Sequence, residues 1–193
     1  MKSPFYFIIE PKGERYNNIK KVEDKELIIN ADISKHEFIN RQGIVKSVPL
    51  AYKTEIEVGD NIIVNHNVFR RWYDVKGREK NSRSFIDEKT YLVEPDQIYA
   101  YKRFWRWRPI QGYCFVKPVK NDWKYSLYPE KPLVGIVKYS SNYLKEGDIV
   151  GFCPNDEYEF VIDGEKLYRI MNKFITMKYE HKGNQEAYNP SWA

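Results

Sequence analysis

The sequence predicts an all-β protein built from two small units in tandem, and three observations support this prediction. Short runs rich in Phe, Tyr, Ile and Val alternate with turns that contain Gly, Pro, Asn or Asp. No long stretch repeats its apolar residues with the helical period of about 3.6 residues. Several sequence blocks of the first half recur in the same order in the second half, as in an internal duplication. We expect roughly six or seven short strands in each unit, closed into a small barrel with long loops.

The first two blocks open each copy. Tyr6–Pro11 (YFIIEP) matches Tyr113–Pro118 (YCFVKP), and both runs are typical of a strand that ends at a proline, where the ladder loses a donor. Gly43–Lys46 (GIVK) recurs unchanged as Gly135–Lys138. Each of these blocks predicts a strand that begins at a glycine, the residue with the widest choice of backbone angles.

The next two blocks close each copy. Val58–Asp60 (VGD) corresponds to Glu146–Asp148 (EGD), and an apolar run follows in both cases. A Gly-Asp pair before an apolar run predicts a tight turn that leads into a strand. Tyr91–Ile98 then pairs with the run Tyr168–Ile175 as a closing strand.

The repeat predicts a domain organisation with a short aromatic junction. We expect one unit over residues 1–103, a second over 104–180 and a flexible polar tail over 181–193. Three aromatic residues stand at the junction: Phe104, Trp105 and Trp107. We expect them to be buried where the units pack, because aromatic side chains bury large areas.

Composition and charge indicate a globular protein of modest basicity. Hydrophobic residues make up 42% of the 193 residues, which argues against disorder. The net charge of +5 is mild for a nucleic-acid binder. Cys114 and Cys153 form no CxxC pair, so we expect free thiols, no metal site and a reducing compartment. The start is too short for a signal peptide and no apolar run could span a membrane, so we expect a soluble, cytoplasmic protein.

Catalytic motifs are missing from the sequence. His36, His66 and His181 are scattered and form neither an HxH nor an HExxH pattern. No phosphate-binding or dinucleotide-binding glycine motif and no recognisable nucleophile elbow occurs. We therefore predict that the protein is not an enzyme and needs no cofactor.

The order of the four blocks resembles the co-chaperonin (GroES) family. The second copy matches best, with Gly147–Asp156 similar to the family's turn, strand and next turn, and Leu167–Met171 similar to its closing strand. The resemblance covers nearly the whole chain. It implies two tandem GroES-like β-barrels and a co-chaperonin that caps a chaperonin ring and encloses a client protein during ATP-dependent folding. It also implies a homo-oligomeric ring, a heptamer, in the cytoplasm or in the host cytoplasm if a phage encodes the protein.

The resemblance also implies a chaperonin-binding mobile loop at about residues 16–41. There are 31 residues between Pro11 and Gly43 but 16 between Pro118 and Gly135, so the extra length falls where the family has this loop. Its apolar trio would be Leu27, Ile28 and Ile29. The alternative is that these three aliphatics form an ordinary core strand. Because the second copy has no comparable trio, only the first copy would grip the chaperonin.

A basic segment at about residues 69–86 takes the place of the family's roof hairpin. Its cations outnumber Asp74 and Glu79 and are Arg70, Arg71, Lys76, Arg78, Lys80 and Arg83. We expect a solvated hairpin here. The alternative is a dome wall suited to an acidic client.

Two other functions compete with the co-chaperonin. The run Arg103–Arg108 interleaves cations with aromatics, the composition of a stacking platform, so a single-stranded nucleic-acid-binding barrel is one alternative, although we do not expect it. A phage virion structural or decoration ring protein is the other, and the richness in Lys, Asn, Ile and Tyr suits a phage.

Overall fold

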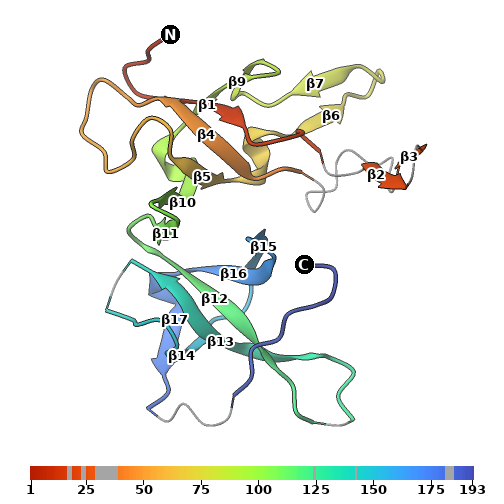
Figure 1. Cartoon of the computed structure of the whole chain (residues 1–193), viewed down its shortest axis with the longest axis vertical. Helices are drawn as coiled ribbons and strands as arrows, with labels where there is room; N and C mark the ends of the chain where they lie inside the picture. Colours follow the sequence, from red (N-terminus) through yellow and green to blue (C-terminus); the bar gives the residue numbers. More distant parts are fainter. Residues whose placement is uncertain (17–18, 23–24, 29–38, 124, 142, 181–184) are drawn as a thin grey trace. The chain divides into compact units, whose positions relative to one another are not determined.

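The computed structural model of the chain forms two compact units, Met1–Arg106 and Trp107–Ala193 (Figure 1). It describes all residues except 17–18, 23–24, 29–38, 124, 142 and 181–184, and gives only the backbone of the remaining residues between 19 and 28. Apart from three short 3-10 turns, every described element is a strand. The predicted all-β class is confirmed. Over the same residues, no helix is long and apolar enough to cross a membrane.

The first unit is built on a seven-stranded sheet with the order β11-β10-β5-β4-β1-β9-β8. The strands of this sheet are β1 (Phe7–Pro11), β4 (Gln42–Ser47), β5 (Asn61–Val64), β8 (Phe85–Asp87), β9 (Thr90–Val93), β10 (Ile98–Arg103) and β11 (Arg106–Pro109). The last of them, β11, begins in the first unit and continues into the second. Two hairpins lie outside this sheet: β2 (Ile19–Val22) with β3 (Lys25–Ile28), and β6 (Arg71–Tyr73) with β7 (Glu79–Asn81).

The second unit is built on a six-stranded sheet with the order β15-β16-β12-β13-β14-β17. Its strands are β12 (Tyr113–Lys120), β13 (Glu130–Ser140), β14 (Ile149–Phe152), β15 (Tyr158–Ile162), β16 (Glu165–Met171) and β17 (Ile175–Lys178). Read from β17, this order repeats that of the first sheet from β10 to β8, strand for strand. The sequence repeat is therefore also a repeat of topology.

The two sheets share even their irregularities. In the first unit Ile9 pairs with Val45, and a register shift separates Ile8 from Ile9. In the second unit Val116 pairs with Val137, and the register shifts just before Val116 in the same way. A bulge adds a local twist and tends to be retained as a feature of a fold, so its double occurrence supports duplication.

The Gly-Asp turns are also built alike in both copies. Asp60 accepts a hydrogen bond from the backbone of Glu57 at 2.8 Å, and Asp148 accepts one from the backbone of Lys145 at the same distance. The glycine before each aspartate has a positive φ, 94° at Gly59 in the first copy. Glycine adopts this left-handed conformation without the clash that a Cβ would cause, which explains the Gly-Asp signal in the sequence.

The expected closure into barrels is not found. Each sheet is open, and among the described residues β8 does not pair with β11, nor β15 with β17. Closure requires the two end strands to meet in a staggered ladder. With only three residues, β8 pairs with β9 alone.

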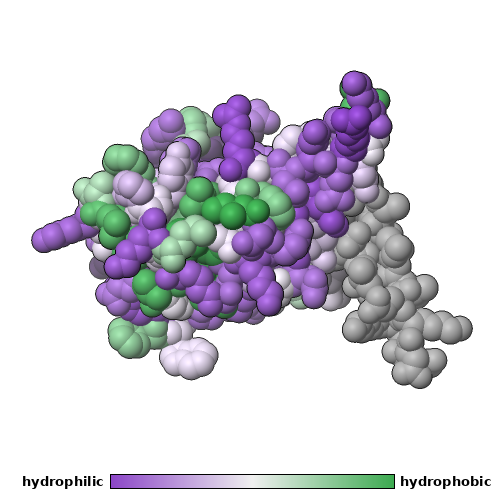
Figure 2. Space-filling view, turned by 90° about the horizontal axis from the view of Figure 1, so that it is seen from above, coloured by the Kyte–Doolittle hydropathy of each residue, from purple (hydrophilic) through white to green (hydrophobic). Residues whose placement is uncertain are grey.

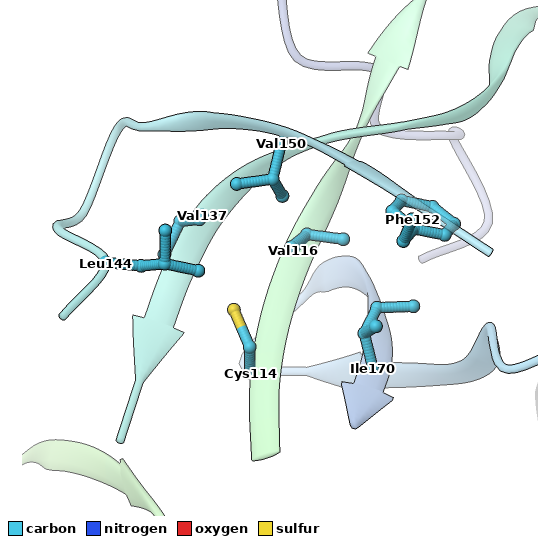
Figure 3. Packing of buried hydrophobic residues seen from close by; sticks show 7 residues of the cluster. All are labelled: Cys114, Val116, Val137, Leu144, Val150, Phe152 and Ile170. Atoms are coloured by element: carbon cyan, nitrogen blue, oxygen red, sulfur yellow. The ribbon is translucent and has the colours of Figure 1, made fainter. Parts of the chain in front are cut away.

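Figure 3 shows the apolar cluster of the second unit that packs on one face of β12. Alternate residues of β12, Cys114 and Val116, point into one apolar cluster, whereas Phe115 faces the other way and packs against Phe160. The remaining members of the cluster are Val137, Leu144, Val150, Phe152 and Ile170. Burial raises the pKa of the Cys114 thiol to about 12. The central strand is thus buried on both faces, consistent with its nearly continuous apolar sequence.

The structure differs from the expected flexible tail over residues 181–193. Residues 181–184 lie outside the described residues, but the segment from 185 to 193 is docked on the second unit rather than free. Ala187 bridges to Val119, and the backbone of Tyr188 donates to the Pro118 carbonyl at 2.9 Å. The register of β16 on β12 ends at Val116, so this edge of β12 is open to the tail. Docking satisfies backbone groups that would otherwise face solvent at a sheet edge.

Candidate interaction site

The candidate site consists of segments that project from the sheets. Among the described residues, no three His, Cys, Asp or Glu side chains gather as they would around a metal ion. On the face shown in Figure 2, hydrophobic side chains lie scattered within a mostly hydrophilic surface. The two copies differ in the segments that connect their shared strands, so the side chains of these segments make up the candidate site.

The β2–β3 hairpin contains most of the predicted apolar trio. Leu27 pairs with Lys20 and Ile28 with Ile19, and this hairpin is separate from the seven-stranded sheet. Ile29 lies outside the described residues. The alternative that Leu27 and Ile28 belong to a strand of the main sheet is thus not what the structure shows.

The two ends of the segment between β1 and β4 are held together by a buried cluster, which we call the neck and which consists of Arg15, Tyr16, Ile39 and Asn40. Tyr16 bridges to Ile39, and both side chains are buried. The side-chain amide of Asn40 donates to the carbonyls of Lys12 and Glu14, each at 2.9 Å. The chain therefore leaves β1 and returns to β4 through one fixed point.

The same neck also forms hydrogen bonds to the chain where the β6–β7 hairpin begins. Arg15 donates from Nε to the Phe69 carbonyl at 2.7 Å, and the backbone of Arg71 donates to the Tyr16 hydroxyl at 2.9 Å. The Arg15 guanidinium lies 5.0 Å from the centre of the Phe85 ring. Both insertions of the first copy thus depart from one cluster. The sequence reasoning missed Arg15 and Tyr16, because their partners lie more than fifty positions away in the chain.

The basic segment forms the hairpin expected of it. Asp74 Oδ1 accepts from the backbones of Lys76 and Arg78 at 2.9 Å, and Gly77 has a φ of 72°. These bonds, first of all that from Arg78, lower the pKa of Asp74. Two of the six predicted cations are in ion pairs, Arg71 with Glu79 and Lys80 with Asp74.

The other four cations of that segment form no ion pair with a described residue. Arg70 lies 5.8 Å from the centre of the Trp72 ring. Within the described part of the chain, Lys76, Arg78 and Arg83 have no ion pair. Val75 at the hairpin tip is fully exposed. The hairpin tip therefore presents two cations without an ion pair, Lys76 and Arg78, beside the exposed Val75, whereas Arg83 follows the hairpin.

A second exposed loop was not anticipated from the sequence. The β12–β13 loop displays four large side chains that are between 68% and 93% exposed: Trp123, Tyr125, Leu127 and Tyr128. It occupies the connection equivalent to that of the β2–β3 hairpin. The signal in the sequence is the density of aromatic residues between two strands, since this loop contains no run of three consecutive aliphatics.

Internal hydrogen bonds hold that loop in shape. Asn121 accepts from the Trp123 backbone at 3.1 Å and donates to Ser126 Oγ at 2.8 Å. Ser126 Oγ accepts in turn from the Tyr128 backbone at 3.1 Å. The polar side chains thus bond within the loop, while the aromatic ones remain exposed to solvent.

The junction residues are divided between two environments. Trp107 is buried at 2% exposure and donates from Nε1 to Asp163 at 3.0 Å. Phe104 and Trp105 are 85% and 93% exposed, contrary to the expected burial of all three. The reason is local: Phe104 and Trp105 form the turn between β10 and β11, whereas Trp107 lies on the inner side of β11.

No protein-family model matches the chain, and no curated protein matches its sequence. The likeness to the co-chaperonin family therefore rests on the sequence blocks, their order and their repetition.

Proposed function

We propose that the protein is a co-chaperonin, a lid without catalytic activity that caps a chaperonin ring and encloses a client protein in the cytoplasm. One observation carries the proposal. The first copy departs from the common six-stranded pattern by a segment between β1 and β4 and a hairpin between β5 and β8. The resemblance assigns these connections to chaperonin binding and to the roof of the dome.

The apolar trio would supply the grip on the chaperonin. Burying Leu27, Ile28 and Ile29 on a partner contributes about 4–9 kcal/mol in each loop. Ordering the loop on the partner offsets much of this gain. Several loops on one ring raise the effective concentration, so the whole complex is tight while each contact remains weak. A lid that must leave after each cycle requires this combination.

The open sheets support assembly into a ring. Each sheet ends in strands that pair on one side only, and such edges tend to pair with another chain. Head-to-tail contacts that close on themselves give cyclic rings. We expect a heptamer, with the second copy bracing the ring formed by the first.

The test combines assembly with binding. The full chain is examined by native mass spectrometry alone and after mixing with a GroEL-type chaperonin and ATP, followed by refolding of a chaperonin-dependent client. We expect a ring that binds the chaperonin, and a Leu27→Ser, Ile28→Ser variant that keeps the ring but loses binding. Val75→Ser, on the other hairpin, is the matched control and should bind normally.

Two results would overturn the proposal. A monomer at micromolar concentration that leaves the chaperonin unbound would exclude the lid. Recovery of the protein with phage particles, and not with a chaperonin, would favour a virion structural role.

A further inference from the structure

The turn between β10 and β11 has an unusual backbone. It contains two residues, Phe104 and Trp105, with φ values of 48° and 65°. A two-residue hairpin turn with positive φ at both positions favours Asn-Gly, because a bulky side chain is strained there. Core packing does not account for an aromatic pair at this turn, because neither side chain is buried. Residues held in strained conformations without a structural reason often serve a function.

The side chains of this turn are also unusual in their exposure. Phe104 and Trp105 are 85% and 93% exposed, although the preceding strand β10 is buried over Ile98–Tyr101. The rings therefore project from a rigid base. The exposed pair offers two neighbouring π faces to a ligand.

Unpaired positive charge follows the aromatic pair. Arg106 and Arg108 lie on the exposed side of β11. In the described part of the chain neither guanidinium has a hydrogen bond or an ion pair. Arg103, by contrast, is held by Asp60 at 2.7 Å. The sequence from 97 to 121 contains no acidic residue, so the ligand that complements this surface is anionic.

We propose that Phe104, Trp105, Arg106 and Arg108 form a binding site for single-stranded nucleic acid. The two rings would stack on successive bases, and the guanidinium groups would contact the flanking phosphates. An anionic lipid surface is less suited, because insertion into a bilayer depends on a wide contiguous apolar face and this tip has two apolar side chains. The site goes beyond the lid function and does not depend on it.

The aromatic part is tested by exchanging the turn. The variant Phe104→Asn, Trp105→Gly removes both rings and installs the residues that the turn favours. We expect it to bind a fluorescent single-stranded DNA of about 12 thymidines at least about tenfold more weakly by anisotropy, since each of the two stacked bases contributes about fivefold or more. Its melting temperature should be unchanged or higher, and its chaperonin binding unchanged. Equal affinity of the variant and the parent would overturn the proposal.

The charged part is tested by salt dependence. Arg106→Gln with Arg108→Gln should reduce the slope of log affinity against log salt by about 1.4, or about 0.7 for each lost phosphate contact. The control Lys53→Gln with Lys145→Gln removes the same charge from exposed positions elsewhere and should leave the slope within error of the parent. A slope unaffected by the arginine variant would overturn the phosphate contacts. Binding to phosphatidylglycerol vesicles without binding to DNA would replace nucleic acid by a lipid surface.

Discussion

At the scale of single residues, two glycines show how closely the copies correspond. Gly43 and Gly135 stand at equivalent places in β4 and β13. A Cβ at Gly43 would lie 2.8 Å from the Ile9 Cδ1 atom, and a Cβ at Gly135 would lie 2.5 Å from Val116 Cγ2. Ile9 and Val116 are themselves equivalent residues of the repeat. In both copies, glycine is therefore required by the approach of the neighbouring strand.

The two glycines should nevertheless differ in how much stability is lost when each is replaced by alanine. Gly135→Ala should lower the free energy of unfolding by about 1–3 kcal/mol, because the new methyl overlaps the stiff Cβ-branched side chain of Val116. Gly43→Ala should cost less, since the Ile9 Cδ1 atom ends a longer side chain and can move aside. Urea denaturation of both variants measures the difference. Equal losses would contradict this account.

Glu165 is a residue whose charge should make stability depend on pH. Burial acts to raise its pKa, but the hydrogen bond from Lys117 at 2.5 Å and the charges of Lys117 and Lys138 outweigh it and lower the pKa below 4.5. A lowered pKa contributes stability that is present above the unfolded value and lost as the pH falls through the folded value. The advantage of the parent over Glu165→Gln should therefore be constant near neutral pH and shrink as the pH falls below about 5 toward the lowered pKa. Thermal unfolding at several pH values would reveal it, and a constant difference would contradict it.

At the scale of elements, the copies keep their strands and differ in their connections. The inner strands share order and register, whereas the projecting segments differ in length, charge and apolar content. The β12–β13 loop shows how a connection gains a fixed shape without a core. Asn121 and Ser126 satisfy backbone groups that would otherwise need water, as polar side chains commonly do in turns.

Removing the hydrogen bonds of Asn121, which form the internal frame of the β12–β13 loop, should make this loop open more often. Asn121→Ala removes the acceptor for the Trp123 amide and a donor to Ser126. One hydrogen bond contributes on the order of 1 kcal/mol, so amide exchange at Trp123 and Ser126 should quicken by about five- to tenfold in hydrogen-exchange measurements. Leu127→Ala, at an exposed position in the same loop, is the control and should leave these rates unchanged. Unchanged rates in Asn121→Ala would show that the frame is not what orders the loop.

At the scale of the whole molecule, the second unit has the features of an independent domain. It includes its own sheet, an apolar cluster and a docked tail. The tail adds backbone hydrogen bonds at Pro118 and Lys120, and Asn189 bonds to Lys166 and Gly164. The tail is thus part of the domain.

The second unit should fold when produced by itself. A chain of residues 107–193 should unfold cooperatively in urea, because the contacts of its core lie within it. A chain of residues 107–184 should be less stable by about 2–4 kcal/mol, since six hydrogen bonds of the tail are lost, two of them from exposed lysine side chains that contribute little. Circular dichroism during denaturation measures both. Equal stability of the two fragments would mean that the tail contacts contribute nothing.

The sequence by itself determined the all-β class and the location of the repeated blocks. It could do so because strand periodicity, Gly-Asp turns and repeated motifs are local signals that depend on nearby residues. The basic hairpin was predicted for the same reason, since Asp74 and Gly77 define its turn from within four residues.

Only the tertiary structure decided the rest, because those features depend on partners far apart in the chain. Open sheets rather than barrels follow from which edges meet. The neck depends on Arg15 finding the Phe69 carbonyl, 54 residues away. The tail is docked because the pairing of β16 with β12 stops at Val116, which leaves the end of β12 available to the tail. Trp107 alone of the junction aromatics is buried because it lies on the inner side of β11. Neither composition nor spacing specifies which edge is free or which side of a strand faces the core.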